Sequence, residues 1–543
     1  MRFPSLPLRR LVVSAALVPL LFALGCAKRE STVALGNQNG VFHISIGSEP
    51  TDLDPHTVTG LGDAKVIQSL FDPLVSFEPV TLKPVPALAE RWETSADGLT
   101  YTFHLRANAK WSNGDPVTAQ DCVDSWRRIL TPALAADYAY FLHLIRGAEA
   151  FNKGTTTDFS TVGAKAVDAR TLVVTLTHPA PYFLQILLNS PWRPVHVRSI
   201  AAAGDPYRRG QPWTKPGKLV SSGPFVLKEW ASHQRVVVEK SPTYWDRDRV
   251  KLNAVHFYPT DSIDAEERAF RAGQLHATWA LPLSKVLPLQ KENSPNLRID
   301  PNLETYFFRL NVRKAPFTDA RIRRALSLAI DRETIASKIL PGGRKPAPTF
   351  VPDFLTGYTP PKRTAYDPET ARRLLAEAGF PKGANLPPIE ILYNNNEILR
   401  LVCEAVQQMW RRELGVDVRL VNQEYKVVFA NRRAGDYQLL LGTWTADYLD
   451  ATTFLDLWRS GSGNNHTGWT DPAYDALAKK ADATVDPAAR AAILAEAEAL
   501  VLDSAPIIPV YFNTHVYLLH PAVKGWQPTP MDHTDYRYVS LQP

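Results

Sequence analysis

Strand-like and helix-like segments alternate through the second half of this chain, and this alternation limits the fold more than any other sequence feature. Apolar or β-branched runs predict strands at 305–311, 389–393, 416–421 and 507–512. Amphipathic patterns separate them, and several predicted helices begin at an Asp-Pro pair, which places proline at the first helical position. This order favours an α/β sheet covered by helices on both faces. A length of 543 residues suggests two to four domains.

The first half of the chain shows a different pattern of predicted secondary structure. Residues 72–197 contain short strands, hairpins and short helices, which predicts a small α+β module inserted into a larger domain. Strand patterns resume after residue 198. Residues 27–40 are mostly small or polar and include two glycines, so they are expected to form a tether.

The first 26 residues have the pattern of a signal peptide. Arg2, Arg9 and Arg10 precede the apolar run 11–24, which is too short to cross a bilayer comfortably. The run ends in Ala-Leu-Gly before Cys26, which resembles a bacterial lipobox and predicts lipidation of Cys26. The alternative is an ordinary cleaved signal with an incidental cysteine. Both interpretations predict export to the periplasm or cell envelope, the first with a lipid anchor.

Composition argues against several classes of function. The formal net charge is +6, but basic and acidic residues are interleaved, so no nucleic-acid partner is expected. No nucleophile elbow, phosphate loop, dinucleotide fingerprint or zinc-protease motif occurs. We therefore predict no catalytic residues, no metal site, no cofactor and no enzyme activity. Cys122 and Cys403 either pair or, as the pattern around Cys403 favours, remain buried apolar side chains.

Residues 437–450, with the sequence YQLLLGTWTADYLD, form the strongest candidate for a binding site. The apolar run predicts a buried strand that breaks at Gly442, and a helical pattern follows. Trp444 and Asp447 then lie at a strand-to-helix turn, where open α/β sheets place ligand-binding groups. The competing interpretation makes Asp447 or Asp450 a helix N-cap.

Six segments of the chain, taken together and in order, resemble bacterial ABC-transporter solute-binding proteins of the oligopeptide-binding type, family 5. These segments are 53–56, 102–126, 241–245, 315–332, 376–380 and 442–454. The resemblance implies an α/β fold of the two-lobed periplasmic-binding-protein kind, type II-like and cluster C, with an extra inserted α+β domain. The implied boundaries are 1–26 for the signal peptide, 27–40 for the tether, 41–71, 198–303 and 514–543 for lobe I, 72–197 for the inserted domain and 304–513 for lobe II.

The same resemblance implies a function. A monomeric receptor would hold an extended short peptide between its lobes by main-chain hydrogen bonds and deliver it to the permease of an ABC importer. Asp447 matches the acid that pairs with the peptide ammonium. The other residues that match ligand-contacting positions are Thr59, Gly60, Leu61, Tyr138, Tyr425, Arg432, Thr443, Trp444, Thr445 and Asn464. Tyr138, Tyr425 and Trp444 have an alternative role as packing aromatics.

Three departures from the family pattern bear on the ligand. Relatives hold the peptide carboxylate with a positive residue at the positions of Leu399 and Leu441, which are apolar here. Some relatives have glutamate where this chain has Arg309, so we hypothesise that Arg309 or Arg432 receives the ligand carboxylate; the alternative for Arg309 is a surface salt bridge. A family disulfide is also absent, because Glu304 and Thr445 occupy its two positions.

Other functions stay open at this stage. The same scaffold could bind a murein peptide, a nickel complex or haem. A peptide hydrolase of the cell envelope is disfavoured because no nucleophile with a general base is visible. A structural or chaperone-like envelope lipoprotein would show no saturable binding of small ligands.

Overall fold

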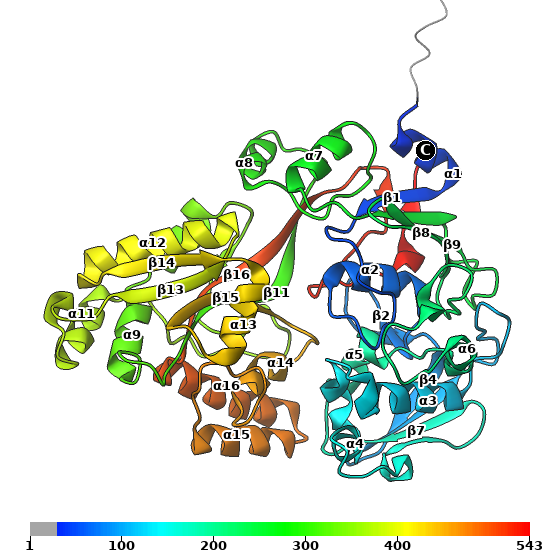
Figure 1. The fold of residues 1–543 in the computed structure, drawn as a ribbon, viewed down its shortest axis with the longest axis horizontal. Coiled ribbons are helices and arrows are strands. Elements are labelled where there is room, and N and C mark those ends of the chain that lie inside the picture. The colour runs from blue at the N-terminus through cyan, green and yellow to red at the C-terminus, as the bar shows by residue number, and fades with distance from the viewer. Residues whose placement is uncertain (1–29) are drawn as a thin grey trace, which may run out of the picture.

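Two long strands carry the chain between the two lobes of the molecule. The computed structural model describes residues 30–543, so the predicted signal peptide and Cys26 lie outside the described residues. Strand β11 (Leu297–Leu310) pairs antiparallel with β16 (Ile507–Leu518), from Leu297 opposite Leu518 to Arg309 opposite Ile507. Figure 1 shows this ribbon running from one lobe to the other. The pairing shifts register between Pro301 and Thr305, which interrupts the ladder along the crossing.

Lobe I is built around a four-stranded sheet in the order β1-β10-β9-β8. Strands β1 and β10 are parallel, whereas the other pairs are antiparallel. Its buried residues, among them Phe42, Val236 and Phe257, form one apolar core. The elements are β1 (Val41–Ser45), α2 (Leu61–Leu70), α6 (Val197–Ala203), β8 (Phe225–Ala231), β9 (Arg235–Lys240), β10 (Ala254–Tyr258), α7 (Ile263–Arg271), α8 (Leu283–Lys291), β17 (Val523–Lys524) and β18 (Ser540–Leu541).

The predicted tether is wrong for residues 32–39, which form helix α1 (Thr32–Asn39). The Ser31 side chain accepts a hydrogen bond from the Ala34 amide, and Gly40 ends the helix at φ 66°. Val33 is buried, and Asn37 is hydrogen-bonded to the His276 ring at 3.0 Å. The capping pair and this packing against lobe I order a segment whose composition suggested a linker.

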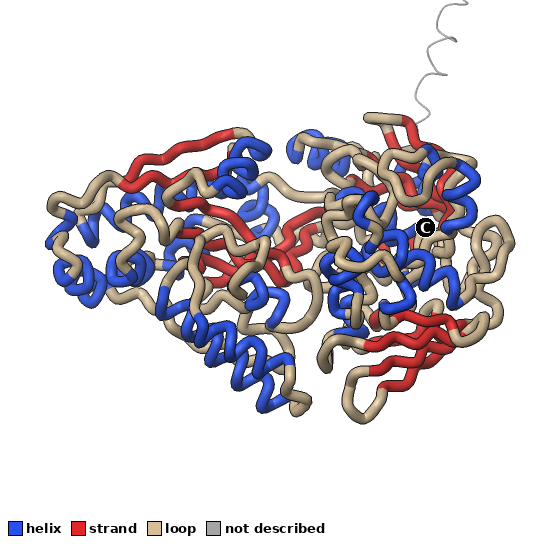
Figure 2. The backbone as a smooth tube through the Cα atoms, turned by 60° about the horizontal axis from the view of Figure 1, so that its bottom comes forward, coloured by secondary structure: helices blue, strands red, loops and turns tan. Residues whose placement is uncertain are grey.

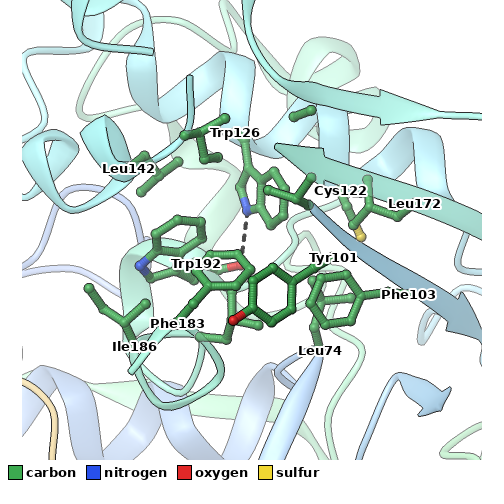
Figure 3. Packing of buried hydrophobic residues seen from close by; sticks show 14 of the residues in the cluster. Leu74, Tyr101, Phe103, Cys122, Trp126, Leu142, Leu172, Phe183, Ile186 and Trp192 are labelled. Atoms are coloured by element: carbon green, nitrogen blue, oxygen red, sulfur yellow. Dashed lines mark hydrogen bonds between the residues drawn. The ribbon is translucent and has the colours of Figure 1, made fainter. Parts of the chain in front are cut away.

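The inserted domain has its own sheet and its own core. The sheet is antiparallel in the order β4-β5-β7-β6. Helix α3 buries Trp126, whose indole packs edge-on against Trp192 at 5.4 Å and donates a hydrogen bond to its carbonyl (Figure 3). The elements are β2 (Val75–Phe77), β3 (Pro84–Pro86), β4 (Ala89–Thr94), β5 (Thr100–Leu105), α3 (Ala119–Leu130), α4 (Ala148–Asn152), β6 (Ala164–Ala166), β7 (Thr171–Thr175) and α5 (Phe183–Ile186).

Lobe II contains a six-stranded mixed sheet in the order β12-β16-β11-β15-β13-β14. Phe308 and Leu441 face one core with α9 and α12, whereas Phe307 faces the other core with α14 and α16. Helices flank the central strands (Figure 2). The elements are α9 (Ala320–Leu328), α10 (Arg332–Thr334), β12 (Lys345–Pro346), α11 (Pro368–Glu377), β13 (Ile389–Asn394), α12 (Glu397–Leu414), β14 (Val418–Gln423), α13 (Tyr425–Ala434), β15 (Leu439–Thr445), α14 (Thr452–Leu455), α15 (Pro472–Asp482) and α16 (Pro487–Ser504). The α/β architecture with an inserted α+β domain is therefore confirmed.

The two described cysteines do not pair. Cys122 lies in the core of the inserted domain and Cys403 in a core of lobe II, and both are free and buried. Burial raises the pKa of each thiol above its ordinary value. They behave as small apolar residues.

Candidate functional site

A cavity of about 650 Å³ lies between the inserted domain and lobe II. Three of the predicted binding residues line it: Trp444, Asp447 and Asn464. The opposite wall comes from the inserted domain and includes Tyr140 and Tyr182. The cavity therefore joins two parts of the chain that are far apart in sequence.

The turn after β15 fixes the position of Asp447 through its main chain. The Asp447 amide donates to Thr453 Oγ1 at 2.9 Å, and its carbonyl accepts from the Asn189 side chain at 2.6 Å. The N-cap alternative is wrong for both acids, because Ala451 is the N-cap residue of α14; Asp450, one residue earlier, accepts a hydrogen bond from the Thr452 amide at 3.0 Å. The Asp447 carboxylate is therefore available to a ligand in the cavity.

Asp447 differs from the other acids that line the cavity. Asp137 pairs with Arg209, Glu149 with Lys153 and Asp456 with Arg459. Within residues 30–543, the Asp447 side chain makes neither an ion pair nor a hydrogen bond, and burial raises its pKa to about 7. A half-buried carboxylate without a partner is a favourable site for a cation such as an ammonium group.

Aromatic side chains surround this carboxylate. Burial raises the pKa of Tyr138 to about 12, and the charge of Asp447 adds to the shift. Burial and Asp447 also raise the pKa of Tyr140. Tyr425 on α13 is 63% exposed and is not among the residues that line the cavity. Trp444 donates to the Thr453 carbonyl at 2.7 Å, so it both packs against the core of lobe II and faces the cavity.

Arg309 and Arg432 lie together on the same side of the lobe II sheet. Arg309 is opposite Leu440 in the pairing of β11 with β15, and its guanidinium donates to the Thr443 carbonyl at 3.4 Å. The surface salt-bridge alternative is wrong, because Arg309 is 1% exposed and has no ion pair in the described part of the chain. Burial, followed by the charge of Arg432, lowers the pKa of Arg309 to about 9.

The two strands at the missing disulfide are joined by hydrogen bonds instead. Glu304 lies directly opposite Thr445 in the ladder. Its carboxylate accepts from the Thr443 hydroxyl at 2.7 Å and from the Asn513 amide at 2.5 Å. This acid therefore connects β15 to β11 and β16 near the cavity wall.

The loop Thr59–Leu61 does not reach the cavity around Asp447. It is exposed at the start of α2 in lobe I, where the Gly60 amide donates to Asp63. Asp54 and His56 anchor this loop to the inserted domain, because Arg128 donates to the Asp54 carboxylate at 2.6 Å and lies 2.9 Å from the His56 ring. Leu399 and Leu441 are both buried in one core of lobe II, so neither contributes to the cavity.

Sequence reasoning missed the aromatic contact that closes one side of the cavity. Tyr182 of the inserted domain stacks on Tyr448 of lobe II with ring centroids 4.7 Å apart. Arg490 lies over the Tyr182 ring and pairs with Asp450. The available signal was the aromatic residues at 182–183 and 444–448, which do not show that rings from separate domains meet.

Neither a metal site nor a membrane span is found in the part of the chain that the structure describes. No three histidine, cysteine or acidic side chains are arranged to hold a metal ion there. From residue 30 onward, no helix combines the length and the apolar character that crossing a bilayer requires.

Comparison with known proteins gives consistent matches along the chain. The profile of the bacterial extracellular solute-binding proteins, family 5, matches residues 83–466. The periplasmic oligopeptide-binding protein OppA of Escherichia coli is 35% identical over 505 residues, covering 91% of both chains. The periplasmic murein peptide-binding protein MppA of the same organism is 36% identical over 504 residues, again covering 91% of both. The crystal structure of Haemophilus influenzae OppA with the peptide RPPGFSPFR matches with a TM-score of 0.81 and 34% identity, covering 93% of this chain and 99% of that one.

Proposed function

Because the chain belongs to the family 5 bacterial extracellular solute-binding proteins, we propose that it captures short peptides between its lobes and delivers them to an ABC importer. Two relatives that align with nine-tenths of the chain are named for oligopeptide and murein peptide binding. The proposal makes the protein a receptor that releases its ligand unchanged.

The observation that carries the proposal is the Asp447 carboxylate in the 650 Å³ cavity. Three other acids of this cavity already have basic partners, whereas Asp447 has none among the described residues. A peptide α-ammonium would provide both the positive charge and the hydrogen-bond donors that this group lacks. Its arrival would also offset the cost of holding a carboxylate away from water.

The surrounding residues fit the remainder of a short peptide. Thr443, Trp444 and Thr445 belong to a strand beside Asp447 and offer main-chain groups to an extended ligand. Tyr138, Tyr425 and Asn464 supply amphipathic walls that suit varied side chains. Thr59–Leu61 would approach from lobe I when the lobes close by a hinge motion of β11 and β16.

We also propose that the protein works as a monomer in the periplasm or cell envelope, held to the membrane through a lipid on Cys26. The lipobox pattern supports the anchor, and the similarity to periplasmic binding proteins supports the compartment. Labelling cells with a radioactive fatty acid tests the anchor: the wild type should incorporate label, and Cys26→Ala should not.

Native mass spectrometry of protein purified from its own host tests the ligand. The wild type should carry bound species with the masses of short peptides, and Asp447→Asn should lose them. Asp137→Asn is the matched control, because Asp137 lines the same cavity but is paired with Arg209. Full retention of peptide by Asp447→Asn, or retention of a non-peptide ligand only, contradicts the proposal. Incubating the protein with peptides and measuring their masses separates this function from hydrolysis, which would release fragments.

A further inference from the structure

Tyr448 of lobe II packs into the core of the inserted domain. It is 7% exposed and belongs to an apolar cluster whose other buried members lie between residues 74 and 192. Tyr182 stacks on its ring with the centroids 4.7 Å apart and an angle of 18° between the ring planes. An aromatic pair of this kind adds to the stabilisation that burial alone supplies. The residue that follows Asp447 is therefore held by the inserted domain.

Asn189 of the inserted domain contacts the same peptide unit. Its side-chain amide donates to the Asp447 carbonyl at 2.6 Å. Asn189 precedes the short 3-10 helix 190–192, but its side chain does not cap that helix, so the amide is available to lobe II. Two side chains that lie close in sequence, at 182 and 189, therefore hold the Asp447 carbonyl and the ring of Tyr448.

The segment that carries these two side chains is anchored in the core of the inserted domain. Phe183 packs on Trp192 at 5.6 Å, and Trp192 packs edge-on against Trp126 of α3 (Figure 3). All three rings are buried. Side chains in such a close-packed core leave the adjoining main chain little room to move. The inserted domain therefore presents Tyr182 and Asn189 to lobe II from fixed positions.

The two domains divide the main chain of Asp447 between them. Lobe II binds its amide, which donates to Thr453 Oγ1 at 2.9 Å, whereas the inserted domain binds its carbonyl through Asn189. The orientations of the two peptide planes that flank a residue set its φ and ψ. These angles in turn limit the rotamers that its side chain adopts. The contact with the inserted domain therefore helps to set the direction of the Asp447 carboxylate in the cavity that it lines.

We propose that Tyr182 and Asn189 are positioning residues: by docking on lobe II, the inserted domain orients the Asp447 carboxylate toward the ammonium group of the peptide. The inference rests on the proposed function and adds to it a role for the inserted domain in ligand capture. That domain is joined to lobe I by the buried pair of Arg128 with Asp54. A hinge motion that carries lobe II away from lobe I breaks both positioning contacts. Opening of the lobes thereby weakens the hold on the ammonium group.

Calorimetric titration with trialanine and N-acetyl-trialanine tests the assignment, because only the first peptide carries an ammonium group. The wild type should bind trialanine roughly 10- to 100-fold more tightly, the range expected for hydrogen bonds between charged groups. Asn189→Ala and Tyr182→Ala should each reduce this ratio by about 3- to 10-fold, chiefly through weaker binding of trialanine. The ratio compares two ligands on one variant, so a smaller fraction of folded protein does not change it.

A conservative variant and a control separate positioning from stability. Tyr182→Phe keeps the ring that stacks on Tyr448 and should restore the ratio that Tyr182→Ala loses. Asn253→Ala is the matched control, because Asn253 donates the same kind of hydrogen bond to the Asn39 carbonyl within lobe I, and it should keep the wild-type ratio.

Two results overturn the proposal while leaving peptide capture intact. One is an equal loss of affinity for both peptides in Asn189→Ala and Tyr182→Ala, which would make the contacts purely structural. The other is a wild-type ratio in both variants. A wild type that binds the two peptides equally contradicts the ammonium site at Asp447, and the positioning role with it. Failure of the wild type to bind either peptide contradicts peptide capture itself.

Discussion

Two buried ion pairs stabilise lobe I and its junction with the inserted domain, whereas three charged side chains in lobe II, one of them in the cavity, lack an opposite charge in the described chain. Arg128 of the inserted domain meets Asp54 of lobe I at 2.6 Å, and within lobe I Lys65 meets Asp532 at 2.7 Å. Burial alone would raise the pKa of Asp54, yet Arg128 holds it below its ordinary value. These pairs connect segments that lie far apart in sequence, so they are part of the framework.

In lobe II, Asp447 on the cavity wall and the buried Arg309 and Arg432 are without opposite charges in the described chain. The pKa of each of these three groups is shifted toward the neutral form, chiefly by burial. Other buried charges that lack an ion pair in the described chain, such as Arg332 and Glu498, are hydrogen-bonded to the main chain or to a hydroxyl. Buried ion pairs therefore join distant parts of this fold, whereas we expect Asp447, whose side chain has neither an ion pair nor a hydrogen bond among residues 30–543, to be held for a ligand.

Removing one partner of the framework pair should have the largest effect. Arg128→Met leaves Asp54 buried without its counter-charge, which should lower the free energy of unfolding by about 3–5 kcal/mol. The apparent Tm, measured by calorimetry, should then fall by roughly 10 °C. Arg127→Met, at the exposed neighbouring position of α3, is the control and should melt like the wild type. Equal melting of both variants would show that the Asp54–Arg128 pair does not stabilise the framework.

The affinity for peptide should depend on pH through Asp447. Its pKa of about 7 in the free protein means that the carboxyl becomes neutral as pH falls, while the peptide ammonium stays charged. Affinity should therefore be highest near pH 7.5, where most of the carboxyl is ionised and most of the ammonium is still charged, and should fall on the order of 20-fold by pH 5.5, measured by fluorescence or calorimetric titration. Asp447→Asn should bind weakly and show no such dependence. A wild-type affinity that is constant over this range would remove Asp447 from the ammonium site.

An exposed pair should have the smallest effect. Asp436 pairs with Lys314 at 3.2 Å, and its side chain is 78% exposed. Asp436→Asn should change the free energy of unfolding by no more than ~0.5 kcal/mol, because solvent already screens the charges. If Asp436→Asn keeps the Tm and the peptide affinity of the wild type, the contrast between exposed and buried charges is strengthened. If Asp436→Asn lowered the free energy of unfolding as much as Arg128→Met does, burial would not explain why buried ion pairs stabilise the fold more than exposed ones.

The alternating strands and helices of lobe II could be predicted from the sequence because their signals are local. Helices α11, α15 and α16 each begin at a proline, with the preceding aspartate accepting a hydrogen bond from the first turn, as the Asp-Pro pairs predicted. The apolar run 439–441 forms the buried first half of β15. Helix α1 was missed because two glycines and polar residues suggested a linker, although Ser31 and Gly40 were available as capping signals.

The site could be predicted only in part. The cavity brings Trp444, Asp447 and Asn464 together as the family pattern suggested. A structure was needed to show that, within residues 30–543, Asp447 alone among the cavity acids is unpaired. Nothing in the sequence around Arg309 shows that its side chain is buried beside Arg432. The contact of Tyr182 with Tyr448 could not be predicted either, because it depends on how the inserted domain packs against lobe II.

The most direct test of the central claim is the apparent Tm of Asp447→Asn and the wild type at pH 8, with and without saturating trialanine. The folded-state pKa of Asp447 lies above its ordinary value of 3.8, so the wild type loses stability as pH rises from about 4 to about 7. We expect Asp447→Asn, which lacks the buried carboxylate, to have a Tm a few degrees above that of the wild type without peptide. Its Tm should rise far less than that of the wild type when peptide is added. A variant that melts below the wild type and gains as much from peptide would contradict it.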